Sequence, residues 1–373
     1  MSPTPPYDFV IIGAGIAGAS LAYRLSESHR VLVLEREEQP GYHSTGRSAA
    51  MFMEAYGTPQ IQALTRASRA FYESPPEGFS EHPILSPRGC LYVGGPGHDA
   101  LLRDAAGTPG VHPISVAEAL ERLPCLREDA IIGALYEPDA RDLDVHALHQ
   151  GYLRGLRQRG GELRCNAELL AASFADGAWT LQLSDGESLS AAQLVDAAGA
   201  WADQVARRCG IPPVGLQPKR RTAFTFAAPE GMDSSAWPAV IGIDESFYFK
   251  PDAGQLLGSP ANADPVEAQD VQPEELDIAL GVHHIEEHTT LNIRRPSHSW
   301  AGLRSFVADG DLVIGRDPDC PAFFWLAAQG GYGIQSADGV SRLAQALLLE
   351  QPLPESLRQE GVDPQRLSPA RFR

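Results

Sequence analysis

Apolar runs that alternate with amphipathic stretches mark both ends of the chain. Residues 9–12 (FVII) and 31–34 (VLVL) have the length and composition of buried strands, and residues 17–28 between them are predicted to form a helix. The last third repeats this order, with apolar runs at 312–314 and 323–328 and then a helical stretch that continues to position 348. Strands that alternate with helices in this way predict a parallel sheet covered by helices.

The middle of the chain has a different pattern. Short β-like runs are separated by Pro, Gly and Asp, and an acidic helical stretch is expected at residues 273–287. The strands expected in this part cover residues 222–226, 240–243, 246–250 and 299–304. Before it, strands are expected at 88–93, 178–183 and 193–199, and helices at 58–72, 116–123 and 142–157. The pattern predicts a second, β-rich domain inserted between segments of the first.

The turn after the first strand carries a glycine pattern with a physical purpose at each position. Gly13, Gly15 and Gly18 form G-x-G-x-x-G, and Glu35 ends the second apolar run. Gly13 permits a tight turn, Gly15 a close approach of the backbone to a pyrophosphate, and Gly18 close packing of the helix on the strand. The free N–H groups at the helix start favour phosphate, and Glu35 is placed to accept hydrogen bonds from a ribose hydroxyl. Strand, glycines, helix, strand and acid in this order predict a dinucleotide site.

Composition narrows the class of partner. The 373 residues carry a formal net charge of −18, which argues against nucleic acid as a partner because a phosphate backbone requires a basic surface. The five cysteines include no C-x-x-C pair, so neither a metal site nor a disulfide framework is expected. The first residues lack the features of a secretory signal, and no apolar stretch reaches the roughly 18 residues of a membrane span. We therefore expect a cytoplasmic protein without a transmembrane segment, with peripheral contact at the inner face of a membrane left open.

Several motifs, in order along the chain, carry a resemblance to a known family. They are GAGIAG with Glu35, HSTGRSAA at 43–50, DAAGAWAD at 196–203, GLRSF at 302–306 and GGYGIQ at 330–335. Over its whole length the chain resembles the D-amino acid oxidase superfamily of FAD-dependent oxidoreductases. Within that superfamily it is most similar to the bacterial D-arginine dehydrogenases, through segments such as QPGYHSTGRSAA, LHQGYLRG, LQPKRR and LGSPANADP.

The resemblance implies an α/β fold with two domains. A Rossmann-type FAD-binding domain is expected to assemble from residues 1–84, 142–217 and 305–373, and a substrate-binding domain built on a mixed β-sheet from residues 85–141 and 218–304. It also implies non-covalent FAD and oxidation of a D-amino acid to the imino acid by hydride transfer from Cα to flavin N5. The imino acid then hydrolyses to a 2-oxo acid and ammonia, and the electrons pass to an acceptor other than oxygen, such as a quinone.

The expected cofactor site combines small residues, hydroxyl groups and backbone N–H groups. The segment 44–50 is expected near the flavin and its pyrophosphate, and the segment 330–335 would bring a helix N-terminus to the flavin ring. Each segment also fits an ordinary loop or turn. The predicted cofactor-binding residues are Gly13, Gly15, Ala17, Gly18, Glu35, Arg36, Ser44, Thr45, Gly46, Arg47, Ser48, Ala49, Ala50, Met51, Leu169, Ala198, Gly199, Trp201, Gly330, Gly331, Tyr332, Gly333, Ile334 and Gln335.

Four polar residues are predicted to act on the substrate. Arg304 ends an expected strand, and the resemblance assigns its guanidinium fork to the substrate α-carboxylate, which such a fork can bind with two parallel hydrogen bonds. Arg221 and Tyr248 are the predicted helpers at the same carboxylate, and Tyr56 resembles a tyrosine of an active-site lid. Arg221 also fits a solvated basic cluster, and Tyr56 a partly buried loop aromatic.

The substrate amine is expected to meet the glycine-rich segment rather than a titrating side chain. Gly331 and Gln335 are the residues predicted to lie against it. No dedicated base is expected, because a neutral amine already has the lone pair that expels hydride. The protein would contribute positioning and electrostatics, while the cofactor supplies the redox step.

The predicted side-chain pocket departs from the D-arginine dehydrogenases. Those enzymes have a histidine where Met51 stands, and a glutamate that meets the cationic side chain where Cys90 falls. With Met53 and Ile241, these residues predict an apolar pocket that favours D-amino acids with apolar or aromatic side chains, since an unpaired buried guanidinium costs several kcal/mol. Another acid, such as Glu54, is the alternative partner for a cationic side chain.

Other functions remain open from the sequence. A D-arginine or D-lysine dehydrogenase of broad specificity, a glycine or sarcosine-type amine oxidase that uses oxygen, and a 2-hydroxy-acid dehydrogenase would all share this fold. A flavin-binding protein without turnover is the alternative from a different class. Covalent attachment of FAD through Cys320 is a further alternative to non-covalent binding.

Overall fold

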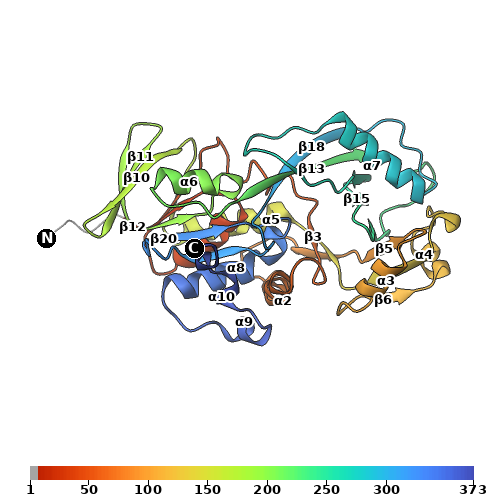
Figure 1. The fold of residues 1–373 in the computed structure, drawn as a ribbon, viewed down its shortest axis with the longest axis horizontal. Coiled ribbons are helices and arrows are strands. Elements are labelled where there is room, and N and C mark those ends of the chain that lie inside the picture. The colour runs from red at the N-terminus through yellow and green to blue at the C-terminus, as the bar shows by residue number, and fades with distance from the viewer. Residues whose placement is uncertain (1–6) are drawn as a thin grey trace.

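Two halves, each built around its own β-sheet, lie side by side along the molecule in this computed structural model, which describes residues 7–373 (Figure 1). The first sheet has a parallel core in the order β9–β2–β1–β12–β20. These strands are β1 (Tyr7–Ile12), β2 (Val31–Leu34), β9 (Glu162–Arg164), β12 (Ser188–Asp196) and β20 (Phe323–Ala327). Antiparallel strands extend it, namely β10 (Leu169–Ala175), β11 (Ala178–Leu183) and β19 (Val313–Arg316).

Each face of this sheet packs against its own hydrophobic core. Along β1, Phe9 and Ile11 enter one core and Val10 and Ile12 the other, as the two-residue repeat of a strand requires. On one side the contacting helices are α1 (Ile16–Leu25), α2 (Pro59–Glu73), α5 (Val145–Gln158) and α8 (Gly333–Leu348), and on the other lies α6 (Ala202–Arg208), as Figure 1 shows. A strand buried on both faces explains why the first apolar run has no polar position.

The second half contains a mixed, mostly antiparallel sheet in the order β17–β13–β16–β15–β14–β5–β7–β6, with β18 paired to the other edge of β13. Its strands are β5 (Cys90–Gly94), β6 (His112–Ile114), β7 (Gly133–Glu137), β13 (Gln217–Phe226), β14 (Ala239–Gly242), β15 (Tyr248–Asp252), β16 (Gln255–Ser259), β17 (Asp264–Pro265) and β18 (His298–Phe306). Its core contains a cluster of phenylalanines, among them Phe224, Phe247 and Phe249, and Ile285 of helix α7 (Glu275–His288) packs into that core.

A small sheet and several short helices complete the fold. The small sheet joins β3 (Met51–Phe52), β8 (Arg141–Leu143) and β4 (Leu85–Pro87). The remaining helices are α3 (Asp99–Ala105), α4 (Val116–Arg122), α9 (Glu355–Gln359) and α10 (Pro364–Leu367), with 3-10 turns η1 (Glu128–Ala130), η2 (Gly199–Trp201) and η3 (Pro369–Phe372).

The predicted fold class is confirmed, since a Rossmann-type parallel sheet and a separate mixed sheet are both present. The first helix ends at Leu25 instead of the predicted 28, and strands β10 and β16 were not predicted. β18 runs from the second half to position 306, two residues past position 304, where the predicted substrate-binding segment ends. The domain boundaries stay a prediction.

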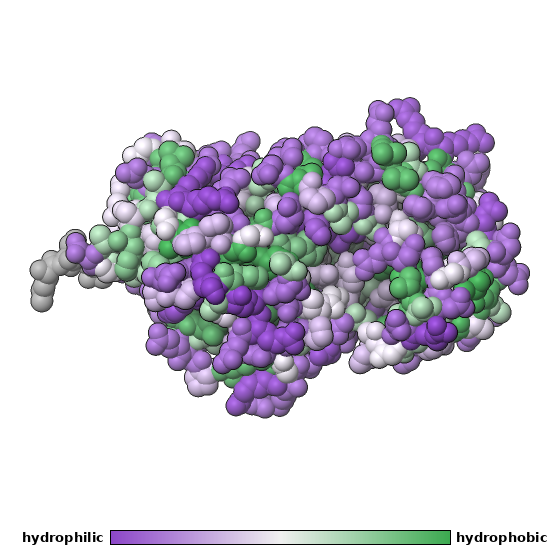
Figure 2. Space-filling model, viewed as in Figure 1, coloured by the Kyte–Doolittle hydropathy of each residue, from purple (hydrophilic) through white to green (hydrophobic). Residues whose placement is uncertain are grey.

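The surface drawn in Figure 2 is largely hydrophilic, with hydrophobic residues in small groups. This agrees with a chain that carries a formal net charge of −18. Of the helices in residues 7–373, none combines the length and apolar character needed to cross a bilayer.

Candidate active site

The glycine turn brings three segments together more closely than other residues allow. A Cβ at Gly13, where φ is +103°, would lie 2.5 Å from the carbonyl oxygen of Ala197, and one at Gly18 would lie 1.9 Å from that of Gly13. The Glu35 carboxylate at the end of β2 accepts the N–H of Ala14 at 2.9 Å, which ties this strand to the turn. Each carboxylate oxygen has a second lone pair, so Glu35 remains able to accept a hydrogen bond from a ribose hydroxyl.

The predicted loop at 44–50 lies against the start of α1. The Thr45 hydroxyl accepts the N–H of Ile16 at 3.0 Å, which leaves its own O–H free to donate to a phosphate. The Ser44 hydroxyl donates to the carbonyl of Leu303 at 2.6 Å, so the loop is also tied to β18 of the other sheet. The loop therefore lies between the two halves of the molecule, where a bound dinucleotide would meet both.

Arg47 has a structural role that the sequence did not indicate. Its guanidinium donates to the carbonyl oxygens of Val271 and Ala301 at 3.2 and 3.0 Å and pairs with Asp270 at 2.5 Å. The residue borders the cofactor cavity, but its charged end is engaged by the second half of the molecule.

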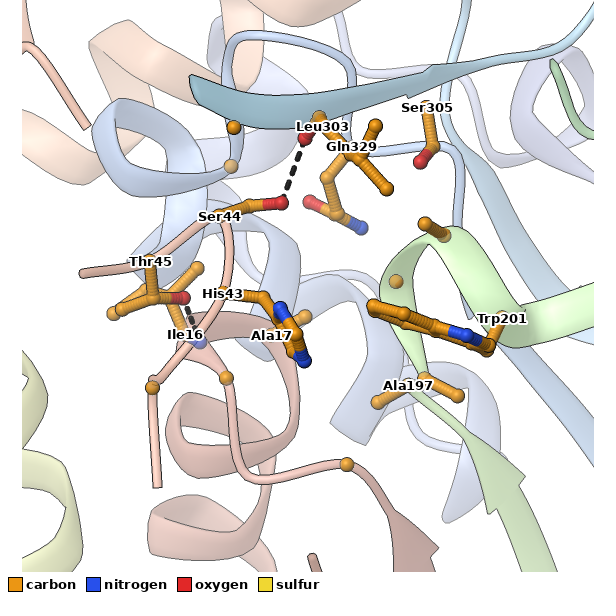
Figure 3. Close-up of a pocket in the computed structure, with 18 of the residues that line it drawn as sticks. Ile16, Ala17, His43, Ser44, Thr45, Ala197, Trp201, Leu303, Ser305 and Gln329 are labelled. Carbon is orange, nitrogen blue, oxygen red and sulfur yellow. Dashed lines mark hydrogen bonds between the residues drawn. The ribbon is translucent and has the colours of Figure 1, made fainter. Parts of the chain in front are cut away.

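A long cavity follows the carboxyl ends of β1, β2 and β12 and continues to β18 (Figure 3). Most predicted cofactor residues border it, namely Gly13, Gly15, Ala17, Glu35, Arg36, Ser44, Thr45, Arg47, Ser48, Ala49, Leu169, Ala198, Gly199, Trp201, Gly330, Gly331, Gly333 and Ile334. Ala50, Met51, Tyr332 and Gln335 border the neighbouring cavity instead.

Two predicted cofactor residues serve packing. Gly18 faces Gly13, as described above, and a Cβ at Gly46 would lie 2.7 Å from the carbonyl oxygen of Gly41. Gly46 also donates its N–H to that carbonyl at 2.8 Å. Gly46 thus closes the loop on itself, and its predicted contact with the cofactor stays a prediction.

His149 of α5 is a residue of this site that sequence reasoning missed. It is buried, and its Nε2–H donates to the carbonyl of Ala14 at 2.8 Å, which supports the glycine turn from behind. Burial lowers the pKa of His149, so the neutral ring is the form that holds the turn. A helical histidine facing the core gives no local signal of this role.

The neighbouring cavity, of about 590 Å³, has the size of a small-molecule site. It shares several bordering residues with the cofactor cavity, so the two meet at a common wall. The shared residues are Ser48, Ala49, Arg221, Tyr248, Arg304, Gly331 and Ile334. Three of the four predicted substrate-binding side chains are thus at the junction, and Tyr56 borders the second cavity.

The antiparallel pairing of β13 and β18 places the two arginines together. Lys219 lies opposite Arg304, so Arg221, two residues further on, lies diagonally across on the same face. Arg220 points to the other face, where it pairs with Asp277 of α7 at 2.9 Å. Arg221 therefore belongs to the cavity, although it stands in a basic cluster in the sequence.

The arginine pair forms a site for an anion. Burial and the adjacent Arg304 lower the pKa of Arg221 to about 10. Burial opposes the charge on Arg304 as well, but the phenols of Tyr56 and Tyr248 raise its pKa overall, and its Nη1 donates to the Tyr56 hydroxyl at 3.2 Å. Two guanidinium groups in a buried cavity favour a carboxylate, whose charge would relieve their mutual repulsion.

The glycine-rich segment before α8 lies directly behind Arg304. A Cβ at Gly331 would be 2.8 Å from Arg304 Nη1, so any larger residue here would displace the guanidinium from its present position. The Gln335 amide donates to the Thr65 hydroxyl at 3.0 Å, and its oxygen accepts the N–H of Met53 at 3.4 Å. Gln335 thus holds the segment that carries Tyr56. The sequence led us to expect Gln335 against the substrate amine and did not predict this structural role.

The wall opposite the arginines is only partly apolar. Met51, Met53 and Ile241 border the cavity as predicted, but Cys90 lies behind this wall in a fully buried cluster, so its predicted place in the pocket is wrong. Tyr92, two residues further along β5, borders the cavity in its place.

Glu137 of β7 is a buried acid in this wall that the sequence analysis missed. It lies directly opposite Cys90 in the β5–β7 pair, and its carboxylate accepts the hydroxyl of Tyr92 at 2.8 Å and the N–H of Ala55 at 3.3 Å. Burial raises the pKa of Glu137. The proposed alternative, Glu54, instead pairs with Arg69 at 2.6 Å and borders neither cavity.

The residues present fit a non-covalent FAD. The glycine turn leaves room for a backbone-bound pyrophosphate, Glu35 offers a ribose acceptor, and the cavity reaches the wall with the substrate site. Cys320 lies in the turn between β19 and β20 and borders neither cavity, which does not favour a covalent bond. Within residues 7–373, no group of His, Cys, Asp or Glu side chains could hold a metal ion.

This fold and site define a dinucleotide-dependent oxidoreductase. The family described as "FAD dependent oxidoreductase" matches residues 8–347, and the chain belongs to this family, with FAD as its cofactor. The resemblance to the superfamily is thereby confirmed.

Similar proteins extend over almost the whole chain. FAD-dependent oxidoreductase domain-containing protein 1 of Bos taurus is 24% identical over 409 residues, covering 93% of this chain and 82% of that protein. Glycine oxidase from Geobacillus kaustophilus superposes with a TM-score of 0.83 at 21% identity and 98% coverage of both chains. L-Proline dehydrogenase from P. horikoshii gives a TM-score of 0.82 at 19% identity, covering 98% of this chain and 97% of that one. At these identities the structural likeness shows the shared fold.

Proposed function

We propose that this protein is an FAD-dependent D-amino acid dehydrogenase that oxidises its substrate to the imino acid. The observation that carries the proposal is the pair of partly buried guanidinium groups, Arg221 and Arg304, at the wall shared by the two cavities. A carboxylate bound there lies between the cofactor cavity and a pocket large enough for a side chain. The preference for the D-isomer rests on the resemblance to the D-arginine dehydrogenases.

The residues of the chain would act mainly by positioning. Arg304 and Arg221 would bind the α-carboxylate, and Tyr248 would donate its phenolic O–H to the same group. Tyr56 would close over the substrate and exclude water. FAD bound in the first cavity would accept the hydride from Cα. The imino acid would then leave the site and hydrolyse in water to the 2-oxo acid and ammonia.

We propose that the pocket prefers apolar or aromatic side chains to cationic ones. Met51, Met53 and Ile241 border it, and a guanidinium against these side chains would lack a partner, because Glu137 already accepts two hydrogen bonds behind Tyr92. A D-arginine or D-lysine dehydrogenase is the second candidate, since the carboxylate of Glu245 borders the same cavity and could pair with a cationic side chain.

An amine oxidase of the glycine or sarcosine type is a further candidate, because glycine oxidase from Geobacillus kaustophilus shares the fold. The two guanidinium groups would serve glycine as well as a larger amino acid, so the carboxylate site does not distinguish them. We propose an acceptor other than oxygen, such as a quinone, on the resemblance to the dehydrogenases.

A single substrate panel tests these alternatives. Purified holoenzyme is mixed anaerobically with D- and L-isomers of Leu, Met, Phe, Arg and Lys and with glycine and sarcosine, and loss of the flavin absorbance is followed. Reduction by D-Leu, D-Met and D-Phe supports the proposal. Faster reduction by D-Arg contradicts the apolar preference, and reduction by L-isomers contradicts the D-preference. No reduction by any of them favours a flavin-binding protein without turnover.

The electron acceptor is tested with the same substrates. Turnover with an artificial dye that clearly exceeds peroxide formation in oxygenated buffer supports a dehydrogenase. Peroxide formation at a rate equal to dye reduction supports the oxidase.

A further inference from the structure

Two aromatic rings from distant parts of the chain meet over the cofactor cavity. His43 lies in the loop after β2 and Trp201 ends the turn η2 after β12, and their ring centroids are 4.5 Å apart. Both border the cavity, and Figure 3 shows the two rings extending toward each other from its opposite sides. Ala17, at the start of α1, and Ala197 also border the cavity at this place, where the helix N-terminus would hold a pyrophosphate.

Each ring is held by a charged neighbour. The Arg36 guanidinium lies 4.2 Å from the centroid of the Trp201 ring, and the Nε2 atom of His43 is hydrogen bonded to Glu37 at 2.9 Å. Burial works against the charge of Glu37, but His43 and Arg36 keep the pKa of this carboxyl below its usual range. The ring pair is therefore supported at both ends.

The contacts continue to the second half of the molecule. The Tyr42 ring meets His43 edge-on at 5.0 Å, and the Arg47 guanidinium lies 5.2 Å from the Tyr42 ring. Arg47 pairs in turn with Asp270. A continuous series of side chains thus crosses the cavity from the first sheet to the segment before α7.

We propose that His43 and Trp201 form a lid that retains FAD in its cavity. The inference rests on FAD as the cofactor and requires no assumption about the amino acid oxidised. The two segments that carry the rings are joined across the cavity by this contact between tilted rings, so a bound dinucleotide would have to separate the rings in order to leave. Removal of either ring loses the ring contact, and loss of Trp201 also removes the contact with Arg36.

The test measures release of FAD from holoenzyme. Wild type and variants are diluted into flavin-free buffer, and the rise in free-flavin fluorescence gives the dissociation rate. We expect Trp201→Ala to release FAD about tenfold faster or more, the effect of losing one aromatic ring contact and one cation–π contact. Trp201→Phe keeps a ring and should stay within about threefold of wild type. Iodide should quench the bound flavin of Trp201→Ala more strongly than that of wild type.

Variants at the other ring make the test independent of the tryptophan. His43→Ala should also release FAD faster, and His43→Phe, which keeps the ring but loses the bond to Glu37, should fall between His43→Ala and wild type. The matched control is His298→Ala, which removes an exposed histidine ring stacked on Trp300 at 5.6 Å, outside both cavities.

The results that would overturn the proposed lid can be stated in advance. Wild-type release rates in both Trp201→Ala and His43→Ala overturn the lid. Faster release in His298→Ala to the same degree also overturns it, because the effect would then follow from general destabilisation. Should Trp201→Ala not fold, His43→Ala alone decides. None of these rates depends on substrate turnover, so failure of the lid and failure of the proposed activity are distinguishable.

Discussion

The two cavities of this protein meet at one wall but are built in different ways. The cofactor cavity is formed mainly by backbone at the ends of parallel strands, with glycines where segments approach each other. The substrate cavity is formed by side chains from the mixed sheet, the loop that carries Tyr56 and the start of α8. A site made of backbone depends on short-range sequence, whereas a site made of side chains depends on how distant strands pair.

The largest expected effect is at the side-chain site. Arg304→Lys keeps a positive charge but loses the fork, so we expect kcat/KM for a D-amino acid to fall about 10²–10³-fold. FAD content should be unchanged, because the backbone-built cavity is intact. Arg220→Lys is the control, since Arg220 faces α7 and should alter stability without altering kcat/KM. Equal losses in both variants would contradict the assignment of the two faces of β13.

A single added methyl group should disrupt the glycine turn of the cofactor cavity. Gly18→Ala would place a Cβ 1.9 Å from the carbonyl oxygen of Gly13, and we expect it to destabilise the protein by about 3 kcal/mol and weaken FAD binding. Thermal unfolding and FAD titration measure both effects. Gly107→Ala, whose Cβ would have its nearest contact at 3.4 Å, is the matched control. An unchanged FAD affinity in Gly18→Ala would show that the turn tolerates movement.

A change at Glu137 should affect the substrate cavity and leave the cofactor cavity unchanged. In Glu137→Gln the amide nitrogen cannot accept the hydroxyl of Tyr92, so the wall of the pocket should shift and kcat/KM should fall about tenfold. The FAD dissociation constant should stay within about twofold of wild type. Glu54→Gln is the control, because Glu54 pairs with Arg69 outside both cavities. A larger effect at Glu54 would restore the alternative acid.

The smallest expected effect is a gain in stability in the cofactor half. Asp196 is buried at the end of β12, and among residues 7–373 its Oδ2 has no hydrogen-bond partner. Burial raises the pKa of Asp196 well above its usual range, so the folded protein keeps the proton to higher pH than the unfolded chain does. The folded state therefore loses relative stability as the pH rises above about 4.

Asp196→Asn removes this titration. The variant should be about 1–2 kcal/mol more stable than wild type at pH 7, and the difference should vanish near pH 3. Urea unfolding across this pH range measures it. A difference that is independent of pH would show that folding leaves the pKa of this carboxyl unchanged.

The expectations drawn from the sequence also fared differently at the cofactor cavity and at the substrate cavity. Gly13, Gly15 and Glu35 were predicted from the sequence because strand, turn, helix and strand lie within one short segment, and the structure places all three at the cofactor cavity. Arg221 and Arg304 were assigned through the resemblance, since nothing local distinguishes Arg221 from Arg220. Their shared face became visible only with the pairing of β13 and β18.

Cys90 and Glu137 show most clearly which features of the substrate cavity could not be predicted from the sequence. The sequence placed Cys90 in the pocket, but the structure places Tyr92 there and sets Glu137 opposite Cys90 across the β5–β7 pair. Cys90 and Tyr92 lie on the same face of β5, because alternate residues of a strand share a face, so the register of β5 with its neighbouring strands decides which of the two reaches the cavity. Register depends on contacts between segments far apart in the chain.

The sequence by itself determined the parallel α/β half, the glycine turn and the class of cofactor, because local geometry and hydrophobic periodicity act over neighbouring residues. The tertiary structure alone decided how Arg221, Arg304 and Tyr248 converge, that Gln335 holds the loop of Tyr56, and that His43 meets Trp201 over the cofactor cavity. Each of these contacts joins segments that only the folded chain brings together.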